Sequence, residues 1–386
     1  MTDKKNPTSS LPTSTEAPSS APGPAPDPAS DEAEIFLTAE DATEKADLLS
    51  VPTRPVKIDE NKSVRGLLEK MEGISFQGRN LGRAHQVWRA MLSEPVMIMM
   101  GLAGAMIPGG MRELVVYMIR NRLIDCVVAT GANFFHDIHE SLGRYHYQSS
   151  PEADDVLLRD NMVDRMYDTL LDEEEFREQD SWIGHFAETL DASRAYTTRE
   201  FLNLLGKEAA KISKVDGIVT AAAKAGLPLF CPAIGDSSIG IGIAENRNLG
   251  KNRLMFDVIG DVVETCYLAG GSPVSGVIYF GGGTPKNFIQ QSEVTATFEH
   301  EAKGGHKYAL QIITDSPHWG GLSGCTFEEA QSWGKIQDEG QMVTVHCDTT
   351  IAMPMLVTAL SEDEELIRNR KKPRFEMGRE LKFRFD

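Results

Sequence analysis

Short apolar runs alternate with amphipathic stretches through most of the chain. Segments with the apolar spacing of a helix, at 110–123, 254–268 and 286–298, lie between most of these runs. The strand-like runs are 95–101, 125–130, 227–231, 274–280, 308–314 and 342–347. Continuous apolar strands that alternate with helices are typical of a parallel sheet covered on both faces. We therefore predict an α/β fold with a doubly wound, mostly parallel, Rossmann-like sheet and helices on both faces.

The segments outside this alternation differ from it in composition. Residues 1–32 are rich in Pro, Ser, Thr and Ala and have almost no large apolar side chain, which predicts a disordered tail without a catalytic part. Residues 33–62 form an acidic lead-in, and the fold proper is expected over 63–360. Residues 361–386 are charged, and we expect a surface helix and a tail there. Within the fold, the polar and acidic stretch 151–215 predicts a helical excursion from the sheet.

Charge and cysteine usage restrict the class of protein. The formal net charge of -18 over 386 residues opposes binding to nucleic acid, because phosphate repulsion would have to be overcome first. The five cysteines contain no C-x-x-C pair, which favours free thiols in a reducing compartment. No apolar stretch approaches the ~20 residues that span a bilayer, and the polar N-terminus lacks an apolar signal core. We expect a cytoplasmic protein that binds no membrane.

Glycine-rich and acidic motifs follow the predicted strands, at the ends where a doubly wound sheet binds its ligands. They are Thr130-Gly-Ala-Asn133, Asp236 with its serines, Gly281-Gly-Gly-Thr-Pro285, Thr314-Asp315 and Asp348-Thr349. A glycine triplet lets a backbone approach a pyrophosphate, although it suits a tight turn equally well. An acid after a strand is often only a helix cap. The G-x-G-x-x-G fingerprint of ordinary dehydrogenases is absent after the first strand.

A single lysine follows a tryptophan and a glycine in the segment from Ser323 to Ile336. Thr326 is expected to cap a short helix, which Gly334 ends in the left-handed conformation. Glu329 and Trp333 are four apart and share a helix face. Beside an indole, Lys335 loses hydration, which favours the neutral amine, a nucleophile able to form an imine. Local spacing alone favours the alternative of a solvated lysine at a helix C-terminus.

Three histidines, His136, His139 and His146, lie near Asp137. Their spacing is not that of a recognised metal motif, and hydrogen-bonded or solvent-facing histidines are the commoner explanation. We therefore predict no metal site.

Several segments, taken together and in order, resemble the deoxyhypusine synthase family. They are Gly131-Ala-Asn133 with His136-Asp137, Cys231-Pro-Ala-Ile-Gly-Asp236-Ser-Ser-Ile-Gly240, Gly281-Gly-Gly-Thr-Pro-Lys286, Asp315-Ser-Pro-His-Trp-Gly-Gly-Leu-Ser323 and Ser332-Trp-Gly-Lys-Ile336. The resemblance extends from about residue 64 to about residue 360. It implies a transferase that uses NAD to oxidise a polyamine such as spermidine and holds the aminobutyl group as a lysine imine. The implied acceptor is a lysine of a translation factor or a free diamine. A homotetramer with NAD where two subunits meet is also implied.

The resemblance assigns roles to individual positions. It implies that Lys335 is catalytic and that Glu329, Trp333, Asn287 and His136 contact the substrate, His136 also lying near NAD. The implied NAD contacts are Gly104, Ala105, Pro108, Thr130, Gly131, Ala132, Asp236, Gly282, Thr314, Asp315, Asp348 and Thr349.

The chain departs from the eukaryotic pattern of that family at several positions. Phe135 and His136 stand where the family has paired glutamates, and Asn287 stands where it has a histidine credited with proton transfer. Ile241 and Leu322 replace acidic polyamine contacts. The donor and acceptor amines therefore stay open. A non-catalytic NAD- or polyamine-binding protein on the same fold and an NAD dehydrogenase without covalent catalysis are the alternative functions.

Overall fold

The computed structural model describes residues 45–297 and 304–385, so the predicted N-terminal tail lies outside the described residues. The chain divides into two units, one ending at Pro52 and the other running from Thr53 onward. The second unit contains every predicted site residue. No helix in the described ranges is both long and apolar enough to cross a membrane.

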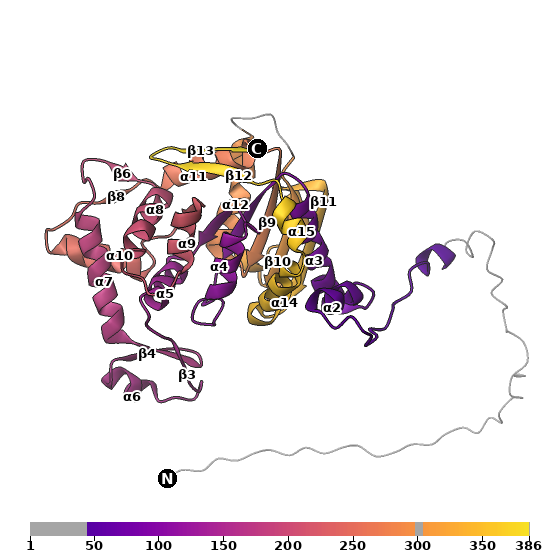
Figure 1. Cartoon of the computed structure of the whole chain (residues 1–386), viewed down its shortest axis with the longest axis horizontal. Coiled ribbons are helices and arrows are strands. Elements are labelled where there is room, and N and C mark those ends of the chain that lie inside the picture. The colour runs from indigo at the N-terminus through magenta and orange to yellow at the C-terminus, as the bar shows by residue number, and fades with distance from the viewer. Residues whose placement is uncertain (1–44, 298–303, 386) are drawn as a thin grey trace, which may run out of the picture. The chain divides into compact units, whose positions relative to one another are not determined.

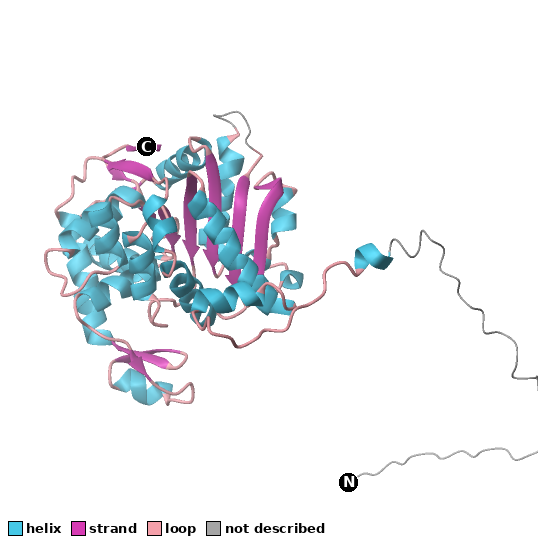
Figure 2. Cartoon of the chain, turned by 45° about the vertical axis from the view of Figure 1, so that its right-hand side comes forward, coloured by secondary structure: helices cyan, strands magenta, loops and turns pink. Residues whose placement is uncertain are grey.

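Six parallel strands form the central sheet, which confirms the predicted fold class (Figure 2). They are β1 (Val96–Leu102), β2 (Cys126–Ala129), β7 (Leu229–Phe230), β9 (Val274–Phe280), β10 (His306–Ile313) and β11 (Ile336–His346). The spatial order is β11-β10-β9-β1-β2-β7. This is the strand order of dinucleotide-binding sheets, and it reverses between β1 and β9. Ligands of such sheets bind at that reversal point.

Helices cover both faces of the sheet because alternate strand side chains enter two apolar cores. Ile98 and Met100 of β1 belong to the core that includes α3 (Phe76–Ser93), α4 (Arg112–Arg120) and α14 (Thr349–Ser361). Met97 and Met99 belong to the core that includes α11 (Val258–Gly270), α12 (Gly283–Ala296) and α13 (Phe327–Gln331). The uninterrupted apolar sequence of β1 follows from burial on both sides.

The predicted helical excursion at 151–215 is only partly helical. It contains α6 (Asp155–Asp160), α7 (Glu173–Glu188) and α8 (Thr198–Ala209). It also contains β4 (Val163–Met166) and β5 (Thr169–Asp172), which with β3 (Tyr147–Gln148) form a small antiparallel sheet (Figure 1). Tyr167 takes a left-handed φ of 56° in the turn between β4 and β5. No glycine marks that turn, so the sequence gives no hairpin signal there.

The charged C-terminal segment does not end in the expected tail. After α15 (Glu364–Asn369), an antiparallel hairpin forms from β12 (Pro373–Met377) and β13 (Leu381–Phe385). Leu381 belongs to the same core as α12, and the ring of Phe383 lies 4.9 Å from that of Tyr267 on α11. The alternation of polar and apolar residues in this hairpin follows from having one face on the protein and the other in solvent.

Candidate active site

Lys335 lies between α13 and β11, at the end of a short helix with the predicted caps. Thr326 Oγ1 accepts a hydrogen bond from Glu329 N at 3.1 Å, and Gly334 has a left-handed φ of 68°. The Lys335 Nζ is 5.4 Å from the centroid of the Trp333 ring. Lys335 is only 9% exposed, whereas Trp333 is 65% exposed. The burial of the lysine therefore depends on the surrounding fold as well as on its tryptophan neighbour.

A pocket of about 370 Å³ brings Lys335 together with three of its predicted partners. Its lining residues are Asn287, Gln290, Gln291, Pro317, Gly320, Gly321, Leu322, Cys325, Glu329, Ala330, Trp333 and Lys335. Glu329 is the carboxylate of this lining. Its lining residues come from α12 and α13, so the pocket lies on the sheet face that these helices cover. We define these lining residues as the lysine pocket.

Two glutamines of α12 belong to the lysine pocket although the sequence analysis did not select them. Gln290 and Gln291 follow Asn287 by three and four residues, so all three lie on one helix face. Gln290 is 2% exposed, and its Nε2 finds no hydrogen-bond partner in the described part of the chain. Helical spacing from Asn287 is the signal that could have identified them.

A second pocket, of about 450 Å³, lies at the carboxyl ends of β1, β9, β10 and β11. We call it the edge pocket. Six of the predicted cofactor positions line it: Gly104, Gly282, Thr314, Asp315, Asp348 and Thr349. Ala105 and Pro108 lie in the loop that follows Gly104. The edge pocket coincides with the point where the strand order reverses.

The glycine triplet is required by the close approach of two backbone segments. A Cβ atom at Gly282 would lie 2.6 Å from Ser323 Cα, and Gly281 has a φ of 81°. The amino termini of α12 and α14 both open at the edge pocket, where they favour a phosphate charge. Asp348 Oδ1 accepts a hydrogen bond from Thr350 N at 2.7 Å and also caps α14. Two helix termini, a close backbone turn and the carboxylates of Asp315 and Asp348 are groups that fit a dinucleotide.

The remaining cofactor positions lie beside that pocket, where β2 and β7 end. Thr130, Gly131 and Ala132 begin α5 (Gly131–Ser141), and a Cβ atom at Gly131 would collide with Ser237, next to Asp236. Asn133 Nδ2 donates to Gly104 O at 2.9 Å and to Thr130 Oγ1 at 2.9 Å. This amide joins the loops after β1 and β2, so the predicted positions form two adjacent groups along one sheet edge.

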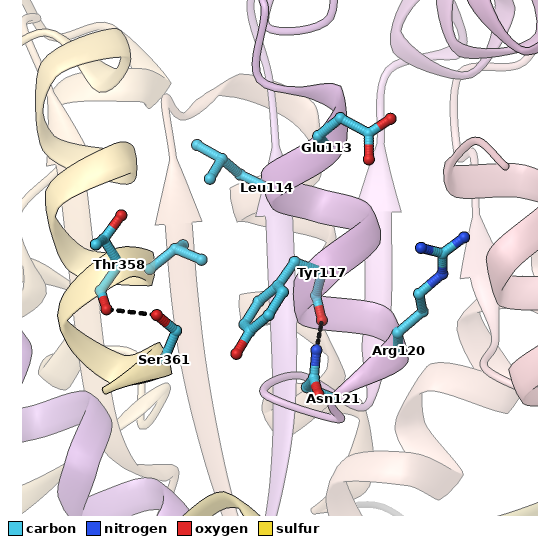
Figure 3. Close-up of a pocket in the computed structure, with 8 residues that line it drawn as sticks. Glu113, Leu114, Tyr117, Arg120, Asn121, Thr358 and Ser361 are labelled. Atoms are coloured by element: carbon cyan, nitrogen blue, oxygen red, sulfur yellow. Dashed lines mark hydrogen bonds between the residues drawn. The ribbon is translucent and has the colours of Figure 1, made fainter. Parts of the chain in front are cut away.

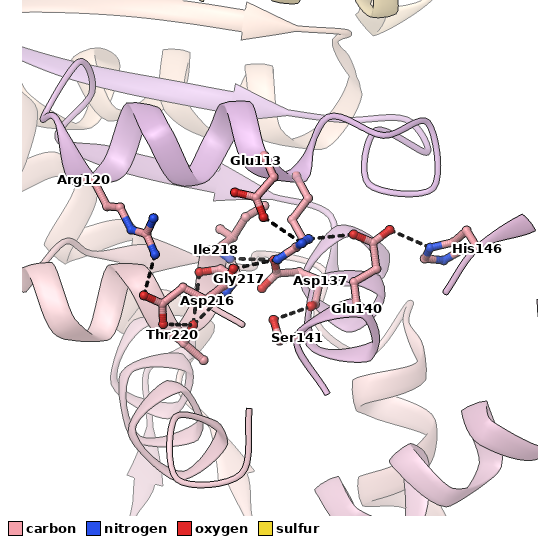
Figure 4. Close-up of polar contacts among 11 residues, drawn as sticks. Glu113, Arg120, Asp137, Glu140, Ser141, His146, Asp216, Gly217, Ile218 and Thr220 are labelled. Carbon is pink, nitrogen blue, oxygen red and sulfur yellow. Dashed lines mark hydrogen bonds and ion pairs between the residues drawn. The ribbon is translucent and has the colours of Figure 1, made fainter. Parts of the chain in front are cut away.

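His136 lies outside the lysine pocket, in a chain of polar contacts. Its Nδ1 is 2.8 Å from His146 Nε2, and His146 Nδ1 is 2.8 Å from Glu140 Oε1. Figure 4 shows His146 and Glu140 facing each other. Glu140 also pairs with Arg112 at 2.7 Å. Burial, reinforced by His146, lowers the pKa of His136 to about 3, so it is neutral at physiological pH. Within the described ranges, no three His, Cys, Asp or Glu side chains are placed to hold a metal ion.

A cavity of about 440 Å³ between α4 and α14 contains none of the predicted site residues (Figure 3). Its polar side chains include Asn121, whose Nδ2 donates to Tyr117 O at 3.0 Å. Ser361 Oγ likewise donates to Thr358 O at 2.7 Å. The charged side chains of the lining are also paired, Glu113 with Arg112 and Arg120 with Asp216.

A family model and curated relatives identify the same family. A family model described as deoxyhypusine synthase matches residues 66–360. A "Probable deoxyhypusine synthase 2" of Methanosarcina acetivorans is 49% identical over 313 residues, covering 81% of this chain and 90% of that protein. Another of that name, from Archaeoglobus fulgidus, is 45% identical over 291 residues, covering 75% and 95%.

One solved structure supports the fold. A "putative deoxyhypusine synthase from Entamoeba histolytica" superimposes with a TM-score of 0.54 at 18% identity, covering 79% of this chain and 96% of that chain. At this identity, the likeness shows the fold alone.

Proposed function

Because the chain belongs to the deoxyhypusine synthase family and is therefore a transferase, we propose that it moves an aminobutyl group through an imine on Lys335. The donor is a polyamine such as spermidine, and the acceptor is a translation-factor lysine or a free diamine. The observation that carries the proposal is that Lys335 shares a single pocket with Glu329, Trp333 and Asn287. The edge pocket adjoins it through the loop that contains Ser323 and Cys325.

Each side chain of the lysine pocket has a separate role in the proposed reaction. Lys335 Nζ in its neutral form attacks the oxidised donor carbon, expels diaminopropane and holds the aminobutyl group until the acceptor amine displaces it. Glu329 binds a substrate ammonium, and Trp333 packs on the alkyl chain. Asn287 orients the amine by hydrogen bonding, because an amide cannot take up a proton at neutral pH.

The edge pocket would hold NAD, which when bound would supply the acceptor for the donor hydride and return that hydride to the imine on the acceptor amine, so that no NADH accumulates. The glycine triplet and the start of α12 would hold the pyrophosphate, and Asp315 and Asp348 would accept hydrogen bonds from ribose hydroxyls. Thr130, Gly131, Ala132 and Asp236 would extend this site. We extend the proposal to a cytoplasmic homotetramer, as the family resemblance implies.

One experiment tests the function directly. The protein is incubated with NAD, spermidine and candidate acceptors, and all products are identified by mass spectrometry. Diaminopropane and an aminobutylated acceptor should appear without net formation of NADH. Accumulation of NADH would identify a dehydrogenase, and binding of NAD without products would identify the non-catalytic alternative.

Replacing Asp348 with alanine should weaken NAD binding about tenfold. The loss of a carboxylate that accepts ribose hydrogen bonds costs about 1.5 kcal/mol, the lower end of the range for bonds to charged groups, which corresponds to about tenfold in affinity. Titration calorimetry measures the dissociation constant.

The control for this variant must account for the cap of α14, since Asp348 is also an N-cap. Asp257→Ala removes the corresponding cap of α11, where Asp257 Oδ1 accepts from Gly260 N at 2.8 Å, and lies outside the edge pocket. Asp257→Ala and Asp348→Ala should each lose ~1 kcal/mol of stability through the loss of a helix cap, but only Asp348→Ala should lose NAD affinity. Equal NAD affinity in wild type and Asp348→Ala would show that Asp348 does not contribute to NAD binding.

A further inference from the structure

A second lysine, Lys286, is buried beside the lysine pocket. It is 1% exposed and lies near the start of α12. Its Nζ donates to Gln311 Oε1 at 2.8 Å, to Ser323 O at 3.4 Å and to Cys325 O. The ammonium has three protons, and these three oxygens match them. All three acceptors are uncharged, which is an unusual environment for a buried lysine.

Gln311 on β10 completes the arrangement. Its Nε2 donates to Gly281 O at 2.9 Å and to Ser323 O at 3.0 Å. Lys286 and Gln311 together therefore fasten the segment 323–325 to β10 and to the glycine triplet. We call these two side chains and the segment they hold the 323–325 clamp.

The clamped segment separates the two pockets of the site. Ser323 lines the edge pocket, and Cys325 lines the lysine pocket. A donor carbon that gives up hydride in one pocket and is attacked by Lys335 in the other must keep a fixed position relative to both. A displacement of ~1 Å in such an arrangement can cost about 10²-fold in rate.

We propose that Lys286 is a positioning residue for aminobutyl transfer: its ammonium and Gln311 fix the segment 323–325 and thereby the spacing between the edge pocket and the lysine pocket. This inference rests on the function proposed above. It assigns to Lys286 a task that does not require contact with the substrate.

The protonation state of Lys286 gives the clamp a pH dependence. Burial lowers the pKa of Lys286 to about 8; Cys325 and Glu329 act to raise it, and Lys335 acts to lower it further. Tyr279 of β9 lies on the same sheet face, and burial raises the pKa of its hydroxyl, which therefore stays neutral. A neutral Lys286 has two N–H groups for three acceptors. The transfer rate should therefore fall as pH rises through about 8, because one backbone or amide oxygen loses its donor.

The test compares full-length Lys286→Met with wild type, both saturated with NAD. Methionine keeps the volume but removes the donors. The kcat of transfer should fall about 100-fold, while the donor KM and the NAD dissociation constant change less than about threefold. Hydrogen exchange in peptides covering 321–327 should rise at least tenfold. Lys307→Met, which alters a half-exposed lysine of β10 that pairs with Glu94 at 2.8 Å, is the control and should change none of these quantities.

Two further variants keep the proposal falsifiable. Gln311→Met removes the other half of the clamp and should give the same rise in exchange, even if Lys286→Met does not fold. Lys286→Arg keeps a charge that cannot be titrated, so its residual activity should lack the decline above pH 8. Unchanged kcat and exchange in Lys286→Met, or an equal loss of NAD affinity, would overturn the positioning role. Wild type that transfers nothing would overturn the proposed function instead, and the exchange measurement would still decide whether Lys286 fixes the segment.

Discussion

Lys335→Arg should abolish aminobutyl transfer, with a loss of about 10³-fold or more in kcat, while NAD binds as tightly as to wild type. Arginine preserves the positive charge and much of the length, but its guanidinium stays protonated and cannot act as the nucleophile. The edge pocket does not include residue 335, so cofactor affinity is independent of this change. The transfer assay and NAD calorimetry measure the two quantities.

Borohydride trapping locates the covalent step. Wild type incubated with NAD and the amine donor should gain an aminobutyl mass on the peptide that contains Lys335, and Lys335→Arg should not. The same spectra should show no adduct on Lys286, which is buried and fully engaged in hydrogen bonds. An active wild type without the adduct at Lys335, or an arginine variant that still turns over, would exclude the covalent mechanism. Glu329 and Trp333 would then be cofactor or structural contacts.

Arg370→Met should destabilise the protein by about 3 kcal/mol, because it leaves a buried carboxylate with one of its two arginine partners, Arg122, whose Nη2 is 2.9 Å from Asp125 Oδ1. Both side chains of the Arg370–Asp125 ion pair are fully buried, and Arg370 Nη1 is 3.1 Å from Asp125 Oδ1. Arg370 also donates to Val96 O at 3.1 Å at the start of β1. Urea unfolding followed by circular dichroism gives the free energy of unfolding.

The neighbouring arginine of α15 provides a matched control. Arg368 pairs with Glu364 at 3.7 Å, and both side chains are largely exposed, so Arg368→Met should change the free energy of unfolding by less than about 0.5 kcal/mol. Asp125→Asn combined with Arg370→Met should recover part of the loss, since the buried carboxylate that has lost one of its arginine partners is then absent. A loss in Arg370→Met no larger than in Arg368→Met would contradict a stabilising role for the buried pair.

The sequence alone was sufficient for features that depend on neighbouring residues. Thr326, Gly334 and the spacing of Glu329 and Trp333 predicted the helix that ends before Lys335, because capping and helical periodicity act over three or four positions. Uninterrupted apolar runs such as 95–101 predicted buried parallel strands, because a strand covered on both faces has no position for a polar side chain. The motifs after successive strands predicted a shared edge, since the carboxyl ends of parallel strands point the same way.

The tertiary structure alone decided which of these local features meet. The strand order places Gly282 and Asp348 in one pocket. The packing of α12 and α13 in one core brings Asn287 to Lys335. The tertiary structure also places His136 against His146, outside the lysine pocket. In the sequence, Lys286 is only the last residue of a glycine-rich motif. The structure shows that it donates a hydrogen bond to Gln311, 25 positions away. Hydrogen bonds and burial between distant positions leave no periodic signal in a single sequence, because they depend on how the elements pack and not on how each one forms.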